Sequence, residues 1–412
     1  MEDKSKMVWE DICQAVESNK NEVFQLSTYI YENPEIAFEE EKACHVLCES
    51  LEKHGFEVAR GAGGLKTAFT AVSCPSGQDG VHIDILGEYD ALGLGDSYGK
   101  EYTVAHACGH NIIAATAVGA GAALKKIMEK YQIPGILRVV GTPAEEGGGG
   151  KIIMQEAGVF EGIDALLMVH PTSGKTKIAG RCKCGFSFKV TYRGLSAHAG
   201  NHKERGFNAQ DAANICYTSV GCLRYQLPDD VQVFCLFTSC SEDRAIIPDV
   251  MKMTISIRCF SVSHLETAIG KVRNCIEAGA LAAGCRVEIQ ECRGTLGRVV
   301  NHTLEQVLRK HVNLLGEPLM DGMVDDNGGE DFGNLNRKIP GIMLYPSLLP
   351  EKKISNHTLE FYNLCNSDRA REMILLGSKA LACTAMELFE NSGIIKNAKE
   401  ELKQVLAAEL QK

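Results

Sequence analysis

Apolar residues recur at helical spacing in several parts of the chain. The pattern predicts a helix over residues 4–31, which Asn33-Pro34 would end, because the residue before a proline disfavours the helical conformation. A second helix is expected over residues 39–54, with Gly55 as its stop. The alanine-rich stretch 105–126 predicts a third helix that is buried.

Short apolar segments alternate with these helices. They predict strands at residues 66–72, 81–86, 136–141 and 165–169. Strands that alternate with helices indicate an α/β fold with a largely parallel sheet.

The pattern changes near Lys183. A strand, a helix, two strands, a helix and a strand follow, an order typical of a small ferredoxin-like α+β domain. Their expected positions are 186–192, 208–220, 231–237, 251–260, 265–283 and 286–291. From about Asn301 the α/β pattern returns, and it ends in a helix-prone tail over residues 369–411.

These patterns predict a discontinuous α/β domain that contains an inserted smaller domain. The expected bounds are 1–184 and 299–412 for the two parts of the larger domain and 185–298 for the insertion. A chain of 412 residues is also longer than one hydrophobic core usually serves.

Composition narrows the classes of function. The chain has 43 basic and 53 acidic residues, a net charge of −10, and no basic run, which argues against nucleic-acid binding. No apolar run reaches the roughly 18 residues needed to span a bilayer, and the polar N-terminus lacks the core of a secretory signal. The 17 cysteines are therefore interpreted as thiols of a cytoplasmic protein that does not bind membranes.

Two short segments carry the residues best suited to chemistry. Cys108 and His110, within Ala105–Asn111, can supply a thiolate and an imidazole to a divalent metal, although such residues are often structural. Glu145 and Glu146 follow the strand at 136–141, where α/β sheets place their ligands. One carboxylate could bind metal and the other move a proton, or both could belong to a solvated turn.

Two further histidines complete the set. His170 follows the strand at 165–169, and His357 lies in Asn356-His357-Thr358. Each alone is an ordinary histidine, but five ligands on separate segments suit two metal ions that share a bridging group. Such ions polarise an amide carbonyl and acidify a bridging water, whose proton Glu145 would accept. His198 could stabilise the oxyanion, although these residues alone favour an ordinary loop histidine.

Several motifs resemble the aminoacylase and carboxypeptidase-G type of dinuclear zinc metallopeptidase. They are residues 33–40 (NPEIAFEE), 106–110 (HACGH), 143–146 (PAEE) and 356–358 (NHT). Further segments are similar to the aminoacylase-1-like (β-alanyl-lysine) dipeptidase branch: 87–92 (GEYDAL), 141–147 (GTPAEEG), Gly150-Lys151 and 331–334 (DFGN). The resemblance runs in order from about Gln25 to Glu387.

The resemblance implies two divalent metal ions, zinc with manganese or cobalt as substitutes. Cys108 would replace the family's bridging acid, Glu145 would be the general base, and Asp90 would orient a ligand from beside the metals. It further implies a homodimer formed through the small domain, with His198 as an oxyanion donor to the partner's site. The remaining implied ligands are His110, Glu146, His170 and His357.

The chain departs from that family at two places. The connection at residues 93–104 is longer than expected, and Ala245 occupies a position where relatives carry a substrate-binding asparagine. Arg258 matches an arginine suited to a substrate carboxylate. The identity of the substrate therefore stays open.

The resulting hypothesis is metal-dependent hydrolysis of an amide bond in a dipeptide or an N-acyl amino acid. Three alternatives remain at this point. The acyl group could be fatty or aromatic, the protein could be a non-catalytic dimeric binding protein, or Cys108 could act as a thiol nucleophile.

Overall fold

The computed structural model describes residues 2–73, 80–95, 102–239 and 243–409. The chain divides into two compact units, and most of the smaller one lies between segments of the larger one in sequence. The larger unit comprises Met1–Arg181, Arg298–Asp325 and Asn334–Ala407, and the smaller one Cys182–Gly297, Asp326–Gly333 and Ala408–Lys412.

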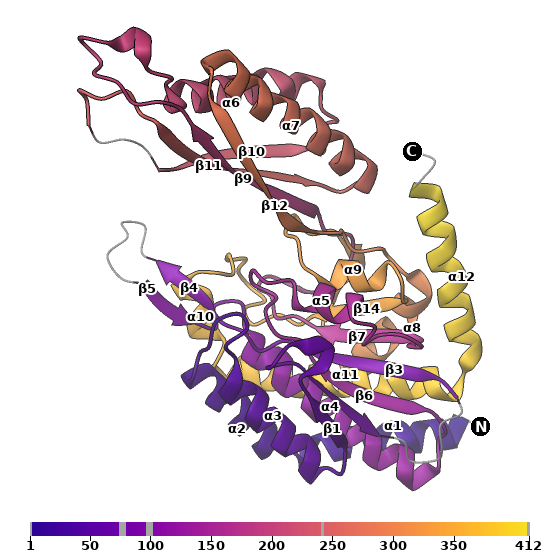
Figure 1. Cartoon of the computed structure of the whole chain (residues 1–412). Coiled ribbons are helices and arrows are strands. Elements are labelled where there is room, and N and C mark those ends of the chain that lie inside the picture. The colour runs from indigo at the N-terminus through magenta and orange to yellow at the C-terminus, as the bar shows by residue number, and fades with distance from the viewer. Residues whose placement is uncertain (1, 74–79, 96–101, 240–242, 410–412) are drawn as a thin grey trace. The chain divides into compact units, whose positions relative to one another are not determined.

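An eight-stranded mixed sheet forms the centre of the larger unit (Figure 1). The four central strands β6, β3, β7 and β14 are parallel, whereas β2 is antiparallel to β6 and β8 is antiparallel to β14. The predicted α/β fold is thus confirmed, but the sheet is mixed, with parallel pairing among the four central strands and between β8 and β13. In spatial order the strands are β1 (Glu57–Arg60), β2 (Phe69–Ser73), β6 (Ile136–Gly141), β3 (His82–Gly87), β7 (Ala165–Val169), β14 (Gly341–Tyr345), β8 (Thr176–Ala179) and β13 (Leu319–Val324).

Helices pack against this sheet, with the buried helix α4 in contact with β3 and β6. The helix expected over residues 4–31 is two helices that meet at Asn19, and the C-terminal tail is two helices that meet at Asn391. The helices are α1 (Glu2–Ser18), α2 (Lys20–Glu32), α3 (Glu41–Lys53), α4 (His110–Tyr131), α5 (Gly150–Glu156), α8 (His302–Leu314), α9 (Phe332–Asn336), α10 (Leu359–Leu364), α11 (Asp368–Glu390) and α12 (Ser392–Glu409), with the 3-10 turn η1 (Ala62–Gly64).

Strands β4 (Leu92–Gly95) and β5 (Tyr102–Ala105) form a separate antiparallel pair. They make up the two ends of the long 93–104 connection noted in the sequence. Its middle, residues 96–101, lies outside the described residues.

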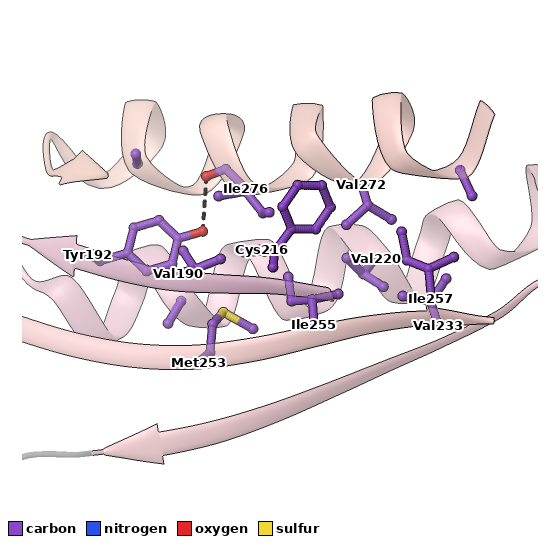
Figure 2. Packing of buried hydrophobic residues seen from close by; sticks show 14 of the residues in the cluster. Val190, Tyr192, Cys216, Val220, Val233, Met253, Ile255, Ile257, Val272 and Ile276 are labelled. Atoms are coloured by element: carbon purple, nitrogen blue, oxygen red, sulfur yellow. Dashed lines mark hydrogen bonds between the residues drawn. The ribbon is translucent and has the colours of Figure 1, made fainter. Parts of the chain in front are cut away.

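The smaller unit has a four-stranded antiparallel sheet in the order β10-β11-β9-β12. Its elements follow the strand and helix order expected from the sequence, with α6 and α7 packed on the sheet. Figure 2 shows the core between them, where the Tyr192 hydroxyl donates to the carbonyl of Ile276 at 2.9 Å. The elements are β9 (Cys184–Arg193), α6 (Ala209–Leu223), β10 (Gln232–Ser239), β11 (Val250–Cys259), α7 (Val262–Ala283) and β12 (Arg286–Thr295), with 3-10 turns η2 (Lys203–Arg205) and η3 (Arg224–Gln226).

Across the described ranges, no helix combines the length and the apolar character needed to cross a membrane.

Candidate active site

The carboxyl ends of three parallel strands place polar side chains at one edge of the larger sheet. Asp90 follows β3, Glu145 and Glu146 follow β6, and His170 follows β7. Because parallel strands end at the same edge, side chains from distant parts of the sequence meet there. Two further segments join them, the turn that starts α4 and the segment that precedes α10.

Cys108 lies at the centre of the cluster. Its Sγ is 3.3 Å from Nε2 of His170 and 3.3 Å from Nε2 of His357. The side-chain amide of Asn356 donates to the same sulfur at 3.4 Å. Cys108 is 4% exposed, whereas His357 and Asn356 are exposed, so the sulfur is buried beneath residues that reach the surface.

The two adjacent glutamates face the other histidine of the cluster. Nε2 of His110 lies 3.7 Å from Glu146 Oε1 and 4.0 Å from Glu145 Oε2. Glu146 Oε1 is also 3.2 Å from Nε2 of His357. Glu146 Oε1 is therefore close to two histidines, whereas Glu145 Oε2 approaches His110 from a greater distance.

Asp90 connects the two halves of the cluster. Its Oδ1 is 2.9 Å from Nδ1 of His110, and its Oδ2 accepts the backbone N–H of Glu146 at 2.9 Å. Asp90 is 1% exposed, and although burial opposes its charge, His110 keeps the pKa of Asp90 below its usual value. The carboxylate thus fixes both the ring of His110 and the turn that carries the glutamates.

Local backbone chemistry explains how the turn before α4 reaches this position. Gly109 has φ of 80°, a left-handed conformation that favours glycine, and a Cβ there would lie 2.5 Å from Pro171 Cγ. The backbone N–H of His357 donates to the carbonyl of Ala107 at 2.8 Å, which brings the 356–358 segment beside Cys108.

Buried contacts also hold the start of α4, directly after the turn at Gly109. The side-chain amide of Asn111 donates to Ser27 Oγ and to the carbonyl of Cys365, each at 2.9 Å. An apolar cluster that includes Ile112 and Phe361 packs α4 against the segment around α10. The site therefore sits on a rigid part of the fold.

The histidine tautomers suit metal ligation. Nδ1 of His170 lies 2.9 Å from the carbonyl oxygen of Pro171, which can only accept, so this nitrogen carries the proton. Nδ1 of His110 faces Asp90 in the same way. In both neutral rings the lone pair is then on Nε2, the nitrogen that points into the cluster.

The donor atoms of these side chains converge. Nε2 of His110 and Oε1 of Glu146 are buried, and neither has a hydrogen bond of good geometry within the described residues. Three sets of donor atoms lie within 4.8 Å of one another. These sets are Cys108, His110 and His170; Cys108, Glu146 and His357; and His110, Glu145 and Glu146.

The electrostatics of the cluster favour a bound cation. Burial, followed by the charge of Glu146, raises the pKa of the Cys108 thiol well above its usual value. A thiolate nucleophile is thereby disfavoured, whereas a divalent cation would stabilise the thiolate as a ligand. Burial lowers the pKa of His110, but Asp90 outweighs this and raises it well above its usual value, so a cation at Nε2 would replace a proton there.

Two charged residues at this edge were not singled out from the sequence. Glu88 is 1% exposed, lies 3.5 Å from Nε2 of His110, and forms a buried ion pair with Lys151. Both residues lay within motifs that carried the resemblance, and Glu88 directly follows β3, which is the signal that could have marked it. Glu88 is the fourth acid of the cluster, beside Asp90, Glu145 and Glu146. Together these acids give the cluster an excess of negative charge, which bound cations would offset.

His198 and Arg258, the remaining candidates, belong to the smaller unit. His198 is exposed, and its Nδ1 accepts the N–H groups of Gly200 and Asn201, each at 3.1 Å. A neutral His198 therefore carries its proton on Nε2 and can donate from there. The segment that carries His198 is held by a hydrogen bond from the N–H of Ala199 to the carbonyl of Ala245, at 2.8 Å.

Arg258 lies on β11 opposite Gln232 of β10. Its side chain is exposed and alternates with Ile257 and Cys259, which are buried in the core beneath α6 and α7. Arg258 thus lies on the sheet face that these helices do not cover.

Several known proteins are similar to this chain in sequence or fold. An Xaa-Arg dipeptidase of Mus musculus is 31% identical over 93% of this chain and 89% of its own length. One component of the p-aminobenzoyl-glutamate hydrolase of Escherichia coli is 25% identical over 97% of this chain and 95% of its own.

Among solved structures, a dinuclear metal-binding peptidase of the M20 family from Bacillus subtilis has the same fold, with a TM-score of 0.67 and 21% identity. That likeness covers 90% of this chain and 99% of the other. The sequence profile of peptidase family M20/M25/M40 matches residues 80–385, which include every candidate site residue. The chain belongs to peptidase family M20/M25/M40.

Proposed function

We propose that this protein hydrolyses the amide bond of a dipeptide or an N-acyl amino acid at the cluster around Cys108. The observation that carries the proposal is the convergence of the Cys108 sulfur, two histidines at 3.3 Å and the Glu146 carboxylate, with Glu145 beside them. The relatives named above are a dipeptidase and an amide hydrolase, and both act on small substrates of this kind.

The proposed metal ligands are Cys108, His110, Glu146, His170 and His357, which would hold two divalent cations. A thiolate together with imidazoles suits zinc better than the harder ions that prefer oxygen alone, although manganese or cobalt could substitute. When bound, such cations would polarise the scissile carbonyl and lower the pKa of water at the site.

Glu145 is the proposed general base. Its carboxylate is 12% exposed, and it directly precedes the ligand Glu146, so a proton acceptor lies next to the atoms that would hold the cations. Glu145 would accept a proton from the attacking water and pass it to the leaving nitrogen. Asp90 would keep the proton of His110 on Nδ1 throughout.

Residues of the smaller unit complete the proposal. His198 would donate from Nε2 to the oxyanion in the active site of the partner subunit, and Arg258 would bind the substrate carboxylate through its paired N–H groups. The resemblance supports a homodimer formed through the domain at residues 185–298, and the cysteine usage supports a cytoplasmic location. Ala245, beside His198 in the loop, cannot supply the side-chain hydrogen bond that an asparagine would.

The test measures turnover of a panel of dipeptides and N-acyl amino acids by protein of known metal content, with and without a chelator. The panel includes cationic, aromatic and fatty acyl groups so that it also shows which acyl groups the protein accepts. Glu145→Gln should lose at least about 1,000-fold in kcat and keep its metal content. Glu161→Gln, at an exposed glutamate, is the matched control and should have wild-type activity.

Hydrolysis that the chelator abolishes and zinc restores would support the proposal. No turnover of any substrate by protein that holds two metal ions would favour a binding protein of the same fold. Substantial turnover by the Glu145→Gln variant would exclude Glu145 as the base.

A further inference from the structure

We propose that Glu40 is a positioning residue that holds Glu145 in its working position through the backbone of Ala144. This inference rests on the proposed function, because it concerns the general base of that reaction. Glu40 lies at the start of α3, more than a hundred residues before the glutamates that it would position.

Glu40 is a carboxylate with no exposed surface. Its Oε1 accepts two backbone N–H groups, those of Phe38 and Ala144, each at 2.9 Å. Its Oε2 accepts the hydroxyl of Thr67 at 2.8 Å. Burial raises the pKa of Glu40, and the hydrogen bonds from Thr67 and Phe38 offset part of that shift.

The two backbone groups that Glu40 binds belong to unusual residues. Phe38 has φ of 68° and Ala144 has φ of 61°, left-handed conformations that residues other than glycine rarely adopt. Such conformations persist only where surrounding contacts enforce them. One carboxylate oxygen thus stabilises both turns, the one before α3 and the one after β6.

Side-chain packing joins the same two turns. A Cβ at Gly148 would lie 2.4 Å from the ring of Phe38 and 2.7 Å from Cβ of Ala144, so the ring covers the turn where only glycine fits. The carbonyl of Ala144 accepts the N–H of Gly148 at 3.1 Å, which closes the turn that contains Glu145 and Glu146.

Glu145 therefore lies between two held amides. Glu40 binds the N–H of the preceding residue, Ala144, and Asp90 binds the N–H of the following residue, Glu146, each at 2.9 Å. The segment around Glu40 also reaches the Asp90 turn, because the carbonyl of Glu35 accepts the N–H of Ala91 at 2.7 Å. The Glu35–Glu40 segment is thus bonded to both turns that set the geometry of the base.

The test compares Glu40→Met, which fills a similar volume without strong acceptors, with Glu40→Gln, whose carbonyl oxygen can still accept both N–H groups. Glu39→Met, at the exposed neighbouring acid, is the matched control. The readouts are kcat and KM with zinc loaded, metal content, and hydrogen exchange of peptides that span residues 142–150.

Glu40→Met should lower kcat about 30-fold, because a small displacement of a catalytic group is costly, while KM changes less than about threefold. Backbone hydrogen exchange in the peptides that span residues 142–150 should be faster in the Glu40→Met protein than in wild type, and the metal content should be unchanged. Glu40→Gln should recover kcat to within about threefold of wild type. Glu39→Met should match wild type in every measurement.

A folded Glu40→Met protein with wild-type kcat would overturn the inference and leave the proposed function intact. Loss of metal with unchanged exchange at 142–150 would also overturn it. If Glu40→Met does not fold, Glu40→Asp carries the test, because its carboxylate is withdrawn by roughly 1.5 Å and should give the same fall in kcat. Failure of the proposed function is separate, since it would appear as no turnover of any substrate by wild-type protein that holds two metal ions.

Discussion

Replacing Asp90 by asparagine tests whether this residue sets the tautomer of His110. An aspartate accepts through both oxygens, but an asparagine accepts through only one. If Oδ1 of the asparagine keeps the N–H of Glu146, its NH2 group faces Nδ1 of His110 and drives that proton to Nε2. The lone pair needed for metal binding is then lost. In the reverse orientation two donors meet at Glu146 and that hydrogen bond is lost instead.

The magnitude follows from the two bonds that Asp90 makes, each at 2.9 Å. A hydrogen bond to a buried charged group contributes about 1.5–3 kcal/mol, and in either orientation the asparagine reverses or loses one of the two. We expect Asp90→Asn to lower the unfolding free energy of the metal-free protein by about 2 kcal/mol. Zinc affinity should fall about 10- to 100-fold, because the outer partner of a ligand histidine is removed.

Zinc affinity is measured by competition with a chromophoric chelator, and stability by urea unfolding of chelator-treated protein. Asp84→Asn is the matched control, because Asp84 is equally buried on β3 but pairs with Arg138 at 2.6–2.7 Å. That variant should lose stability and keep its zinc affinity. Wild-type zinc affinity in Asp90→Asn, or an equal loss in Asp84→Asn, would refute the reasoning.

Two further predictions concern stability. The hydrogen bond with His311 lowers the pKa of Glu387 from 4.5 to about 2, so its stabilisation is present above about pH 4.5 and is lost as pH falls toward 2. Glu387→Gln should therefore cost about 2 kcal/mol at about pH 6 and much less at about pH 3, measured by urea unfolding at both values; a difference independent of pH would contradict this. Gly109→Ala should cost about 3 kcal/mol, because Cβ would meet Pro171 at 2.5 Å in a left-handed conformation. Gly61→Ala, at the similar φ of 78° but with nothing within 4 Å of the added Cβ, should cost only about 1 kcal/mol in the same assay, and equal losses would exclude the steric cause.

The strand at residues 136–141 was predicted at its observed bounds, because a compact apolar run that ends in glycine is a strong local signal. The break at Asn19 was missed, since apolar spacing continues on both sides of it. The helix expected from residue 105 begins at His110, because alanine content does not reveal the left-handed Gly109 that precedes it. Local pattern thus predicts elements better than it predicts their ends.

Residue types at strand ends and in one loop indicated Cys108, His110 and the adjacent glutamates, and the family resemblance added Asp90. The structure brings these residues together. Whether these residues bind metal and catalyse hydrolysis stays a prediction. The pairing of Glu88 with Lys151, 63 residues apart, could not be predicted, because such burial depends on tertiary packing. The same holds for Glu40, whose bond to Ala144 joins positions 104 residues apart.

The placement of β14 in the larger sheet has a consequence for how the chain is made. This strand comes from residues 341–345, yet it lies between β7 and β8, which are synthesised long before it. The smaller unit is mostly contiguous in sequence and can fold as soon as it emerges from the ribosome, whereas β7 keeps an unpaired edge until β14 arrives. His357 is synthesised after β14, so a nascent chain has its full set of candidate ligands only after every strand of the sheet has been made. Ribosomal stalling before residue 341 should leave a chain that exposes an apolar strand edge to chaperones and to other chains.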